Sequence, residues 1–176
     1  MLLNRDELIA ILFRETDRAQ RMKTPLAVIH CGVCDWEAWR GQEEEATLNG
    51  ALRTIAERIT QLLRCYDSVG QVAQGEMVLV LPGCNSCNAS TMAERLNNEV
   101  FALPVKLERT QIQFHACFGV SASTGRSPFV VLRGAERALH LAKAQAAGSV
   151  YCSTAEAEPD PAEFLLPVLQ DKWINS

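Results

Sequence analysis

The 176-residue sequence lacks the features that would place it in a membrane, on a secretory route or on nucleic acid. No hydrophobic run approaches the length of a membrane span, and the N-terminus lacks the basic-then-apolar order of a signal peptide. The formal net charge is −4, without a concentrated basic face. We therefore expect a cytoplasmic protein with no nucleic-acid partner and no membrane insertion of this segment.

Glycine and proline are scarce, with 10 and 7 residues, whereas 48% of the residues are hydrophobic. This balance predicts one globular domain with a substantial core. The stretch after residue 152 differs, because it is polar and proline-rich around a small apolar patch. We assign residues 1–152 to the domain and residues 153–176 to a C-terminal tail.

The sequence also lacks an even number of cysteines. It has seven, and they are spread through apolar segments. This favours reduced core thiols over a disulfide framework. Two CxxC pairs, Cys31/Cys34 and Cys84/Cys87, have a spacing found in zinc sites. Zinc would need both pairs at the same end of the fold, and the topology predicted below separates them, so we expect no metal site there.

Apolar periodicity predicts alternating helices and strands. Asn4 and Glu7 form a capping-box pattern that predicts a helix over residues 5–22, and the apolar run at 26–33 is typical of a buried strand. The spacing from Leu48 to Leu62 predicts an amphipathic helix ending near Arg64. Further segments predict a hairpin at 70–83, a helix at 88–103, a half-covered strand at 112–123, and a last helix opened by Ser127 and Pro128 and capped by Gly148.

This order predicts an α/β (α+β) fold in which helices pack on a central sheet. The strand at 26–33 and the first arm of the hairpin should run parallel through the helix between them. The second arm should then run antiparallel to the strand at 26–33.

Several segments together resemble a GGDEF domain, the fold that in active members condenses two GTP molecules into cyclic di-GMP. The resemblance covers Leu2 to about Val150 and rests on the order of "LLNR", "PLAVIH", "RCYD", "VLVLPG", "AERL", "FGVSAS" and "ERALHLAKAQAAG". It implies a nucleotide-cyclase-like palm with a mostly antiparallel five-stranded sheet. The family's opening motif is missing before Leu2, so we expect a fragment of a longer signalling protein with an attached sensory or receiver domain.

The signature hairpin of the family corresponds here to Ala73, Gln74, Gly75, Glu76 and Met77, and four of its five letters have changed. In the family the two glycines let the backbone approach the nucleotide phosphates, and the third letter is an acid that helps to hold divalent cations. Ala73 and Gln74 add side chains, and Gly75 offers no oxygen. The hairpin then reads as an ordinary turn, in which Gly75 supplies a positive φ and Glu76 is a solvated remnant.

Other positions of the implied nucleotide site differ as well. The end of the first strand, where the family carries a metal carboxylate, reads Gly32, Val33, Cys34, and Mg²⁺ needs hard oxygen ligands. Lys143 is kept. The remaining altered positions are Glu37, Arg40, Asn49 and one near Ser149. The resemblance implies no Mg²⁺ site, no catalytic residues and no cyclase activity, because phosphoryl transfer depends on metals and fixed cations.

An RxxD stretch before the hairpin resembles the family's inhibitory, product-binding site. It supplies Arg64 and Asp67, and Arg95 matches a second arginine of the same pocket. A guanidinium can bond the O6 and N7 edge of guanine, and a carboxylate can accept from its N–H groups. The same residues also suit a scaffold role, because arginine is favourable at a helix C-terminus and aspartate in turns.

Two tryptophans, Trp36 and Trp39, follow the first strand. They either fill the space left by the nucleotide or form a partner-binding surface. The histidines, His30, His115 and His140, are scattered, and we interpret them as core or surface residues rather than a catalytic set.

These observations predict a catalytically inactive GGDEF domain that acts as a regulatory module. It would bind cyclic di-GMP through Arg64, Asp67 and Arg95 and pass occupancy to a protein partner or an attached domain. The alternative is a module that binds no nucleotide and serves a structural, dimerisation or protein-interaction role, including that of a homodimer. Residual GTP binding without turnover is a weaker hypothesis, because the guanine and phosphate contacts are both altered.

Overall fold

A computed structural model describes residues 2–123 and 127–153 of the chain. The predicted tail therefore lies outside the described residues, apart from Ser153. Helix α1 spans Arg5–Met22, as predicted. Its capping box is formed, because the Asn4 side chain accepts from the Glu7 N–H and the Glu7 carboxylate accepts from the Asn4 N–H, both at 2.9 Å. These bonds satisfy donors that a helix N-terminus leaves free.

The central sheet has five strands in the order β2-β3-β1-β6-β7. Their bounds are β1 (Leu26–Val33), β2 (Ser68–Ala73), β3 (Glu76–Pro82), β6 (Ala116–Ser123) and β7 (Val150–Cys152). Strand β1 pairs antiparallel with β3 and with β6, and only β7 joins in parallel. The mostly antiparallel five-stranded sheet is confirmed, as is the direction of both hairpin arms relative to β1. Strand β7 has no counterpart in the elements expected from periodicity.

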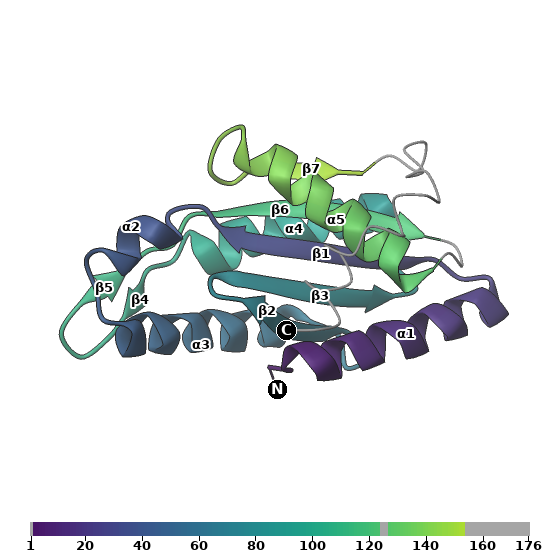
Figure 1. The fold of residues 1–176 in the computed structure, drawn as a ribbon, viewed down its shortest axis with the longest axis horizontal. Coiled ribbons are helices and arrows are strands. Elements are labelled where there is room, and N and C mark those ends of the chain that lie inside the picture. Colours follow the sequence, from purple (N-terminus) through teal and green to yellow (C-terminus); the bar gives the residue numbers. More distant parts are fainter. Residues whose placement is uncertain (1, 124–126, 154–176) are drawn as a thin grey trace, which may run out of the picture.

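Helices cover both faces of the sheet (Figure 1). Helix α1 and helix α5 (Pro128–Lys143) share one apolar cluster with the sheet. On the opposite face lie α3 (Glu45–Leu62), α4 (Ser86–Leu96) and the π-helical turn η1 (Asn97–Phe101). Every residue of β1 is buried because both of its faces are covered, as expected from its continuous apolar run.

The strand predicted at 112–123 is interrupted. Strand β5 (Gln111–Ile112) pairs with β4 (Val105–Lys106), and β6 begins only at Ala116. Residues 116–121 are all buried instead of alternating, because α5 and α4 pack on opposite faces of β6. The prediction of a half-covered strand was therefore wrong for this part.

Two helix predictions also need correction. The helix expected over 88–103 begins earlier, at Ser86, and changes to the wider π geometry at Asn97. Helix α5 ends at Lys143 and not at Gly148. Gly148 has φ +85 and lies in the turn before β7, where its N–H donates to the Ala116 carbonyl at 2.7 Å.

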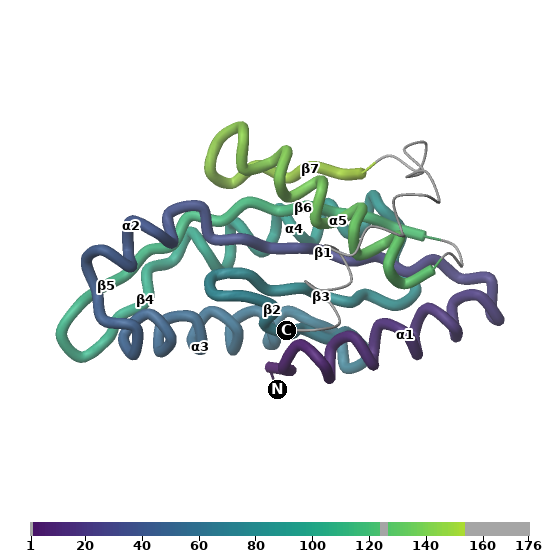
Figure 2. The backbone as a smooth tube through the Cα atoms, in the orientation of Figure 1, coloured from purple at the N-terminus to yellow at the C-terminus, as the bar shows by residue number. Residues whose placement is uncertain are grey.

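A short helix, α2 (Trp36–Arg40), follows β1 in the stretch for which no element was expected. It lies at the same end of the molecule as the β4–β5 ribbon (Figure 2). The Asp35 carboxylate fixes this arrangement, because it accepts from the backbone N–H of His115 at 3.0 Å and from the Trp39 indole at 3.1 Å. These contacts tie α2 to the segment that precedes β6.

Gly119 provides a test of the packing of α5 on β6. A β-carbon at Gly119 would overlap the Ala135 carbonyl and the Leu139 N–H of α5, which are backbone atoms. We expect Gly119→Ala to lower the free energy of unfolding by about 3 kcal/mol or more. Gly50 in α3 has open space around it, so Gly50→Ala should instead raise stability by roughly 0.5–1 kcal/mol. Urea unfolding of both variants checks this, and an unchanged midpoint for Gly119→Ala would contradict the packing.

Candidate functional site

The β2–β3 hairpin meets the end of β1 at one end of the sheet. Gln74 and Gly75 form a two-residue turn between the paired residues Ala73 and Glu76. Gly75 has φ +71, so its predicted positive φ is confirmed. Glu76 lies directly opposite Gly32 of β1, which brings two segments of the implied nucleotide site together. Met77, the last signature position, is buried in the core.

Glu76 is not a solvated remnant, and that prediction was wrong. One carboxylate oxygen lies 2.9 Å from Lys143 Nζ, at the end of α5, and the other lies 3.1 Å from His30 Nε2 in β1. Its side chain is 23% exposed, and that of His30 is 1% exposed. Contact with His30, and then with Lys143, lowers the pKa of Glu76 to about 2 against the opposing effect of burial.

Gly32 leaves room for the Lys143 side chain. A β-carbon at Gly32 would lie 2.7 Å from Lys143 Cε and 2.9 Å from Nζ. The lysine stem therefore crosses the backbone of β1 at the position where the resemblance implies a metal carboxylate. Because Gly32 has no side chain, the Lys143 stem can pass over β1 and reach the Glu76 carboxylate.

Trp36 fills space beside the hairpin. It is 6% exposed, and a β-carbon at Gly75 would lie 2.8 Å from its ring. Its ring centroid lies 5.9 Å from that of Phe114. Trp39 is half-buried and meets the same phenylalanine edge to face at 6.4 Å. Of the two interpretations, the space-filling one describes Trp36, because a buried indole cannot present a docking surface.

The RxxD stretch forms a tight turn after α3. The Arg64 N–H donates to Asp67 Oδ2 at 2.8 Å, and the Asp67 N–H donates to the Arg64 carbonyl at 3.1 Å. The exposed Arg64 guanidinium donates to the Tyr66 hydroxyl at 3.0 Å. Burial raises the pKa of Asp67, while its contacts with Arg64 oppose that effect. Arg64 and Tyr66 also line a cleft of about 270 Å³ whose other residues include Arg18.

Arg95 has a different partner. Its Nε lies 2.8 Å from Glu99 Oε1, one turn further along the chain, and both side chains are about half exposed. The structure thus brings Arg64 and Asp67 together and pairs Arg95 with Glu99.

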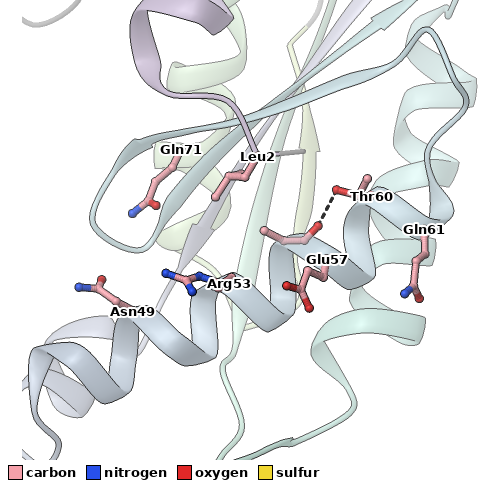
Figure 3. Close-up of a pocket in the computed structure, with 8 residues that line it drawn as sticks. Leu2, Asn49, Arg53, Glu57, Thr60, Gln61 and Gln71 are labelled. Carbon is pink, nitrogen blue, oxygen red and sulfur yellow. Dashed lines mark hydrogen bonds between the residues drawn. The ribbon is translucent and has the colours of Figure 1, made fainter.

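A cavity of about 880 Å³ lies between α3, β2 and the N-terminal segment. In Figure 3, Asn49, Arg53 and Glu57 project from α3, and Gln71 and Leu2 lie across from them. Asn49 occupies the position that the resemblance assigns to guanine contact. The lining offers amide, guanidinium and carboxylate groups, so it could accept a polar ligand. Among the residues that the structure describes, no group of three or more His, Cys, Asp or Glu side chains could hold a metal.

All seven cysteines are free thiols. Cys34 follows β1 and Cys84 follows β3, and these strands are antiparallel, so the CxxC pairs lie at opposite ends of the sheet as the topology predicted. The prediction of core thiols holds for Cys31 and Cys117 only, because Cys34, Cys65 and Cys87 are exposed.

The family model for the diguanylate cyclase GGDEF domain matches residues 1–149. The chain belongs to the GGDEF domain family. A curated relative, the bifunctional diguanylate cyclase/cyclic di-GMP phosphodiesterase MucR of Pseudomonas aeruginosa, is 25% identical over 119 residues, which span 66% of this chain and 17% of MucR. The chain thus matches a small part of that longer protein.

Two solved GGDEF domains have the same fold. The GGDEF domain of TpbB (YfiN) from Pseudomonas aeruginosa has a TM-score of 0.82 at 23% identity, with 88% of this chain and 98% of that chain covered. The GGDEF domain of DgcB from Caulobacter crescentus, in complex with c-di-GMP, has a TM-score of 0.80 at 18% identity, with 88% and 90% covered. The described part of this GGDEF domain contains no helix that could span a membrane.

Glu76→Gln tests the ion-pair arrangement. The folded-state pKa of about 2 lies below the ordinary value of 4.5, so the carboxylate stabilises the fold above about pH 4.5, and this contribution is lost as the pH falls toward 2. We expect the variant to lose up to about 3 kcal/mol of unfolding free energy at neutral pH, and the deficit to shrink in acid. Urea unfolding of the variant and the wild type at several pH values measures this difference in unfolding free energy. Glu37→Gln, which alters an exposed pair with Arg40, is the control and should change stability by about 0.5 kcal/mol or less.

Proposed function

We propose that this GGDEF domain is a signalling module without cyclase activity that binds cyclic di-GMP through Arg64, Asp67 and Arg95. The proposed loss of cyclase activity rests on the Lys143–Glu76 ion pair, which crosses Gly32. Cyclic di-GMP synthesis in the family requires divalent cations at this end of the sheet.

The residues present at this end do not fit Mg²⁺. Gly32 and Gly75 contribute no oxygen, and Glu76, the acid kept in the signature hairpin, already pairs with Lys143 at 2.9 Å. A divalent cation would have to displace an ammonium group from that carboxylate and would gain too few hard oxygen ligands. Trp36 also packs against the turn backbone at Gly75, where the family's hairpin approaches nucleotide phosphates.

A turnover assay tests the loss of activity. Purified protein incubated with GTP and Mg²⁺ or Mn²⁺ should yield no cyclic dinucleotide by chromatography and mass spectrometry, because the reacting phosphate lacks stabilising cations. A known active cyclase under the same conditions is the control. Any product that scales with protein concentration would refute the proposed loss.

Cyclic di-GMP binding is supported by the chemistry of the RxxD turn. The exposed Arg64 guanidinium can form paired hydrogen bonds to guanine or to phosphate. Arg95 lies in an exposed ion pair with Glu99, and such pairs cost well under about 1 kcal/mol to break, so Arg95 remains available to an anion. Membership of the GGDEF family and the likeness to the cyclic di-GMP complex of DgcB support the same ligand.

Calorimetric titration of cyclic di-GMP tests the site. We expect binding that weakens at least about tenfold in Arg64→Ala and in Arg95→Ala, because each removes a charge-assisted contact. Arg40→Ala is the matched control, since Arg40 is also an exposed arginine in an ion pair but lies in α2. GTP serves as the comparison ligand. Equal loss in the Arg40 variant would point to unspecific charge attraction.

The alternative function is a module that binds no nucleotide and acts through protein contacts. This alternative is favoured by the intramolecular contacts of the residues proposed to bind ligand. Arg64, Asp67 and Arg95 all have partners within the chain. If cyclic di-GMP produces neither binding heat nor a thermal shift, the protein-interaction function is favoured. Sedimentation analysis would then test whether the domain forms a homodimer.

A further inference from the structure

A cleft lies beside the RxxD turn, at the end of β3 opposite the hairpin. Its volume is about 270 Å³, and it is formed by the C-terminal half of α1, the turn before β2 and the end of β3. This volume falls just below the range of about 300–1,000 Å³ that is typical of sites for drug-sized ligands. The cleft therefore suits one planar base of a larger ligand rather than a whole cyclic dinucleotide.

Apolar and aromatic groups form the walls of this cleft. Ala19 and Met22 line it from α1, Pro82 from β3 and Tyr66 from the turn. Arg64 donates to the Tyr66 hydroxyl at 3.0 Å, and its guanidinium carbon lies 5.9 Å from the ring centroid. The guanidinium is thus held near the hydroxyl edge of the ring. Because Tyr66 is 50% exposed, its ring offers a surface on which a base can stack.

A buried carboxylate belongs to the same cleft. The Glu15 side chain lines the cleft and is 9% exposed. Its Oε1 accepts from Arg14 Nε at 3.1 Å, whereas its Oε2 lies 3.8 Å from Arg18 Nη1, beyond hydrogen-bond distance. Oε2 can therefore accept a hydrogen bond from a ligand. Guanine offers N–H donors at N1 and N2, whereas adenine has an acceptor at N1, so a carboxylate favours guanine.

We propose that Tyr66 and Glu15 determine the base specificity of the cyclic di-GMP site. One guanine of the ligand enters the cleft, stacks on the Tyr66 ring and donates to the Glu15 carboxylate. Arg64, which lines the same cleft and is exposed, binds the adjoining phosphate. This inference rests on the proposed function, because it names residues that would select guanine at the site of Arg64.

Calorimetric titration of the full chain with cyclic di-GMP tests the stacking role. Tyr66→Ala should weaken binding at least about fivefold, because it removes the aromatic surface. Tyr66→Phe keeps the ring and loses only the hydroxyl, so it should bind more tightly than Tyr66→Ala. Tyr151→Ala is the matched control, since Tyr151 is also an exposed tyrosine but lies in β7, and it should bind as the wild type does.

The ratio of the affinities for cyclic di-GMP and cyclic di-AMP tests base selection. Glu15→Gln replaces one carboxylate oxygen with an N–H donor, so the preference for cyclic di-GMP should fall at least about fivefold. Asp17→Asn is the matched control, because Asp17 also pairs with an arginine of α1, Arg21 at 3.0 Å, but lies outside the cleft lining. Thermal unfolding without ligand checks that each variant is folded at the titration temperature. A loss of stability alone would leave the ratio unchanged.

The outcomes separate this inference from the proposed function. Binding that is lost in Arg64→Ala but unchanged in Tyr66→Ala overturns the role of the cleft and leaves cyclic di-GMP binding standing. An unchanged base preference in Glu15→Gln does the same. Equal weakening in Tyr66→Phe and Tyr66→Ala would assign the effect to the hydroxyl contact with Arg64, and it also overturns the stacking role. No binding by the wild type overturns both proposals.

Discussion

The Glu76–Lys143 ion pair holds together three parts of the chain that meet at one end of the sheet. Glu76 opens β3 at the hairpin, Lys143 closes α5, and the lysine stem passes over Gly32 of β1. Burial of His30 against the same carboxylate adds a second link to β1. Burying a carboxylate to this degree is favourable only because both of its oxygens have partners.

This arrangement has consequences for chemistry. The Lys143 ammonium group, which belongs to the protein itself, neutralises the Glu76 carboxylate. In the same region, the apolar ring of Trp36 packs against Gly75 and fills the space beside the hairpin turn. Loss of cyclase activity, as we propose it, would thus leave a stable structure rather than an empty site.

The RxxD turn lies away from that end. Arg64 precedes β2, and its cleft also includes Pro82, the last residue of β3, and Gly83, whereas the hairpin tip lies at the other end of these strands. Changes around Glu76 therefore need not disturb Arg64 or Asp67. This separation is consistent with our proposal that the domain binds cyclic di-GMP at the RxxD turn without synthesising it.

Local signals in the sequence determined much of the fold. The capping box of α1, the continuous apolar run of β1 and the positive φ of Gly75 depend on neighbours within a few residues, and all three were predictable. The identity of the family followed from the order of such segments. The interruption of the strand at 112–123 and the short strand β7 were not predictable, because they depend on pairing with distant segments.

The state of the candidate site was decided by the tertiary structure. Glu76 looked solvated because its partners are 46 and 67 residues away in the chain, at His30 and Lys143. Likewise, nothing near Trp36 indicated whether the ring would be buried, since Gly75 and Phe114 come from other elements. Sequence patterns report periodicity and turn chemistry, whereas the partner of a charge or a ring is set by which elements the fold brings together.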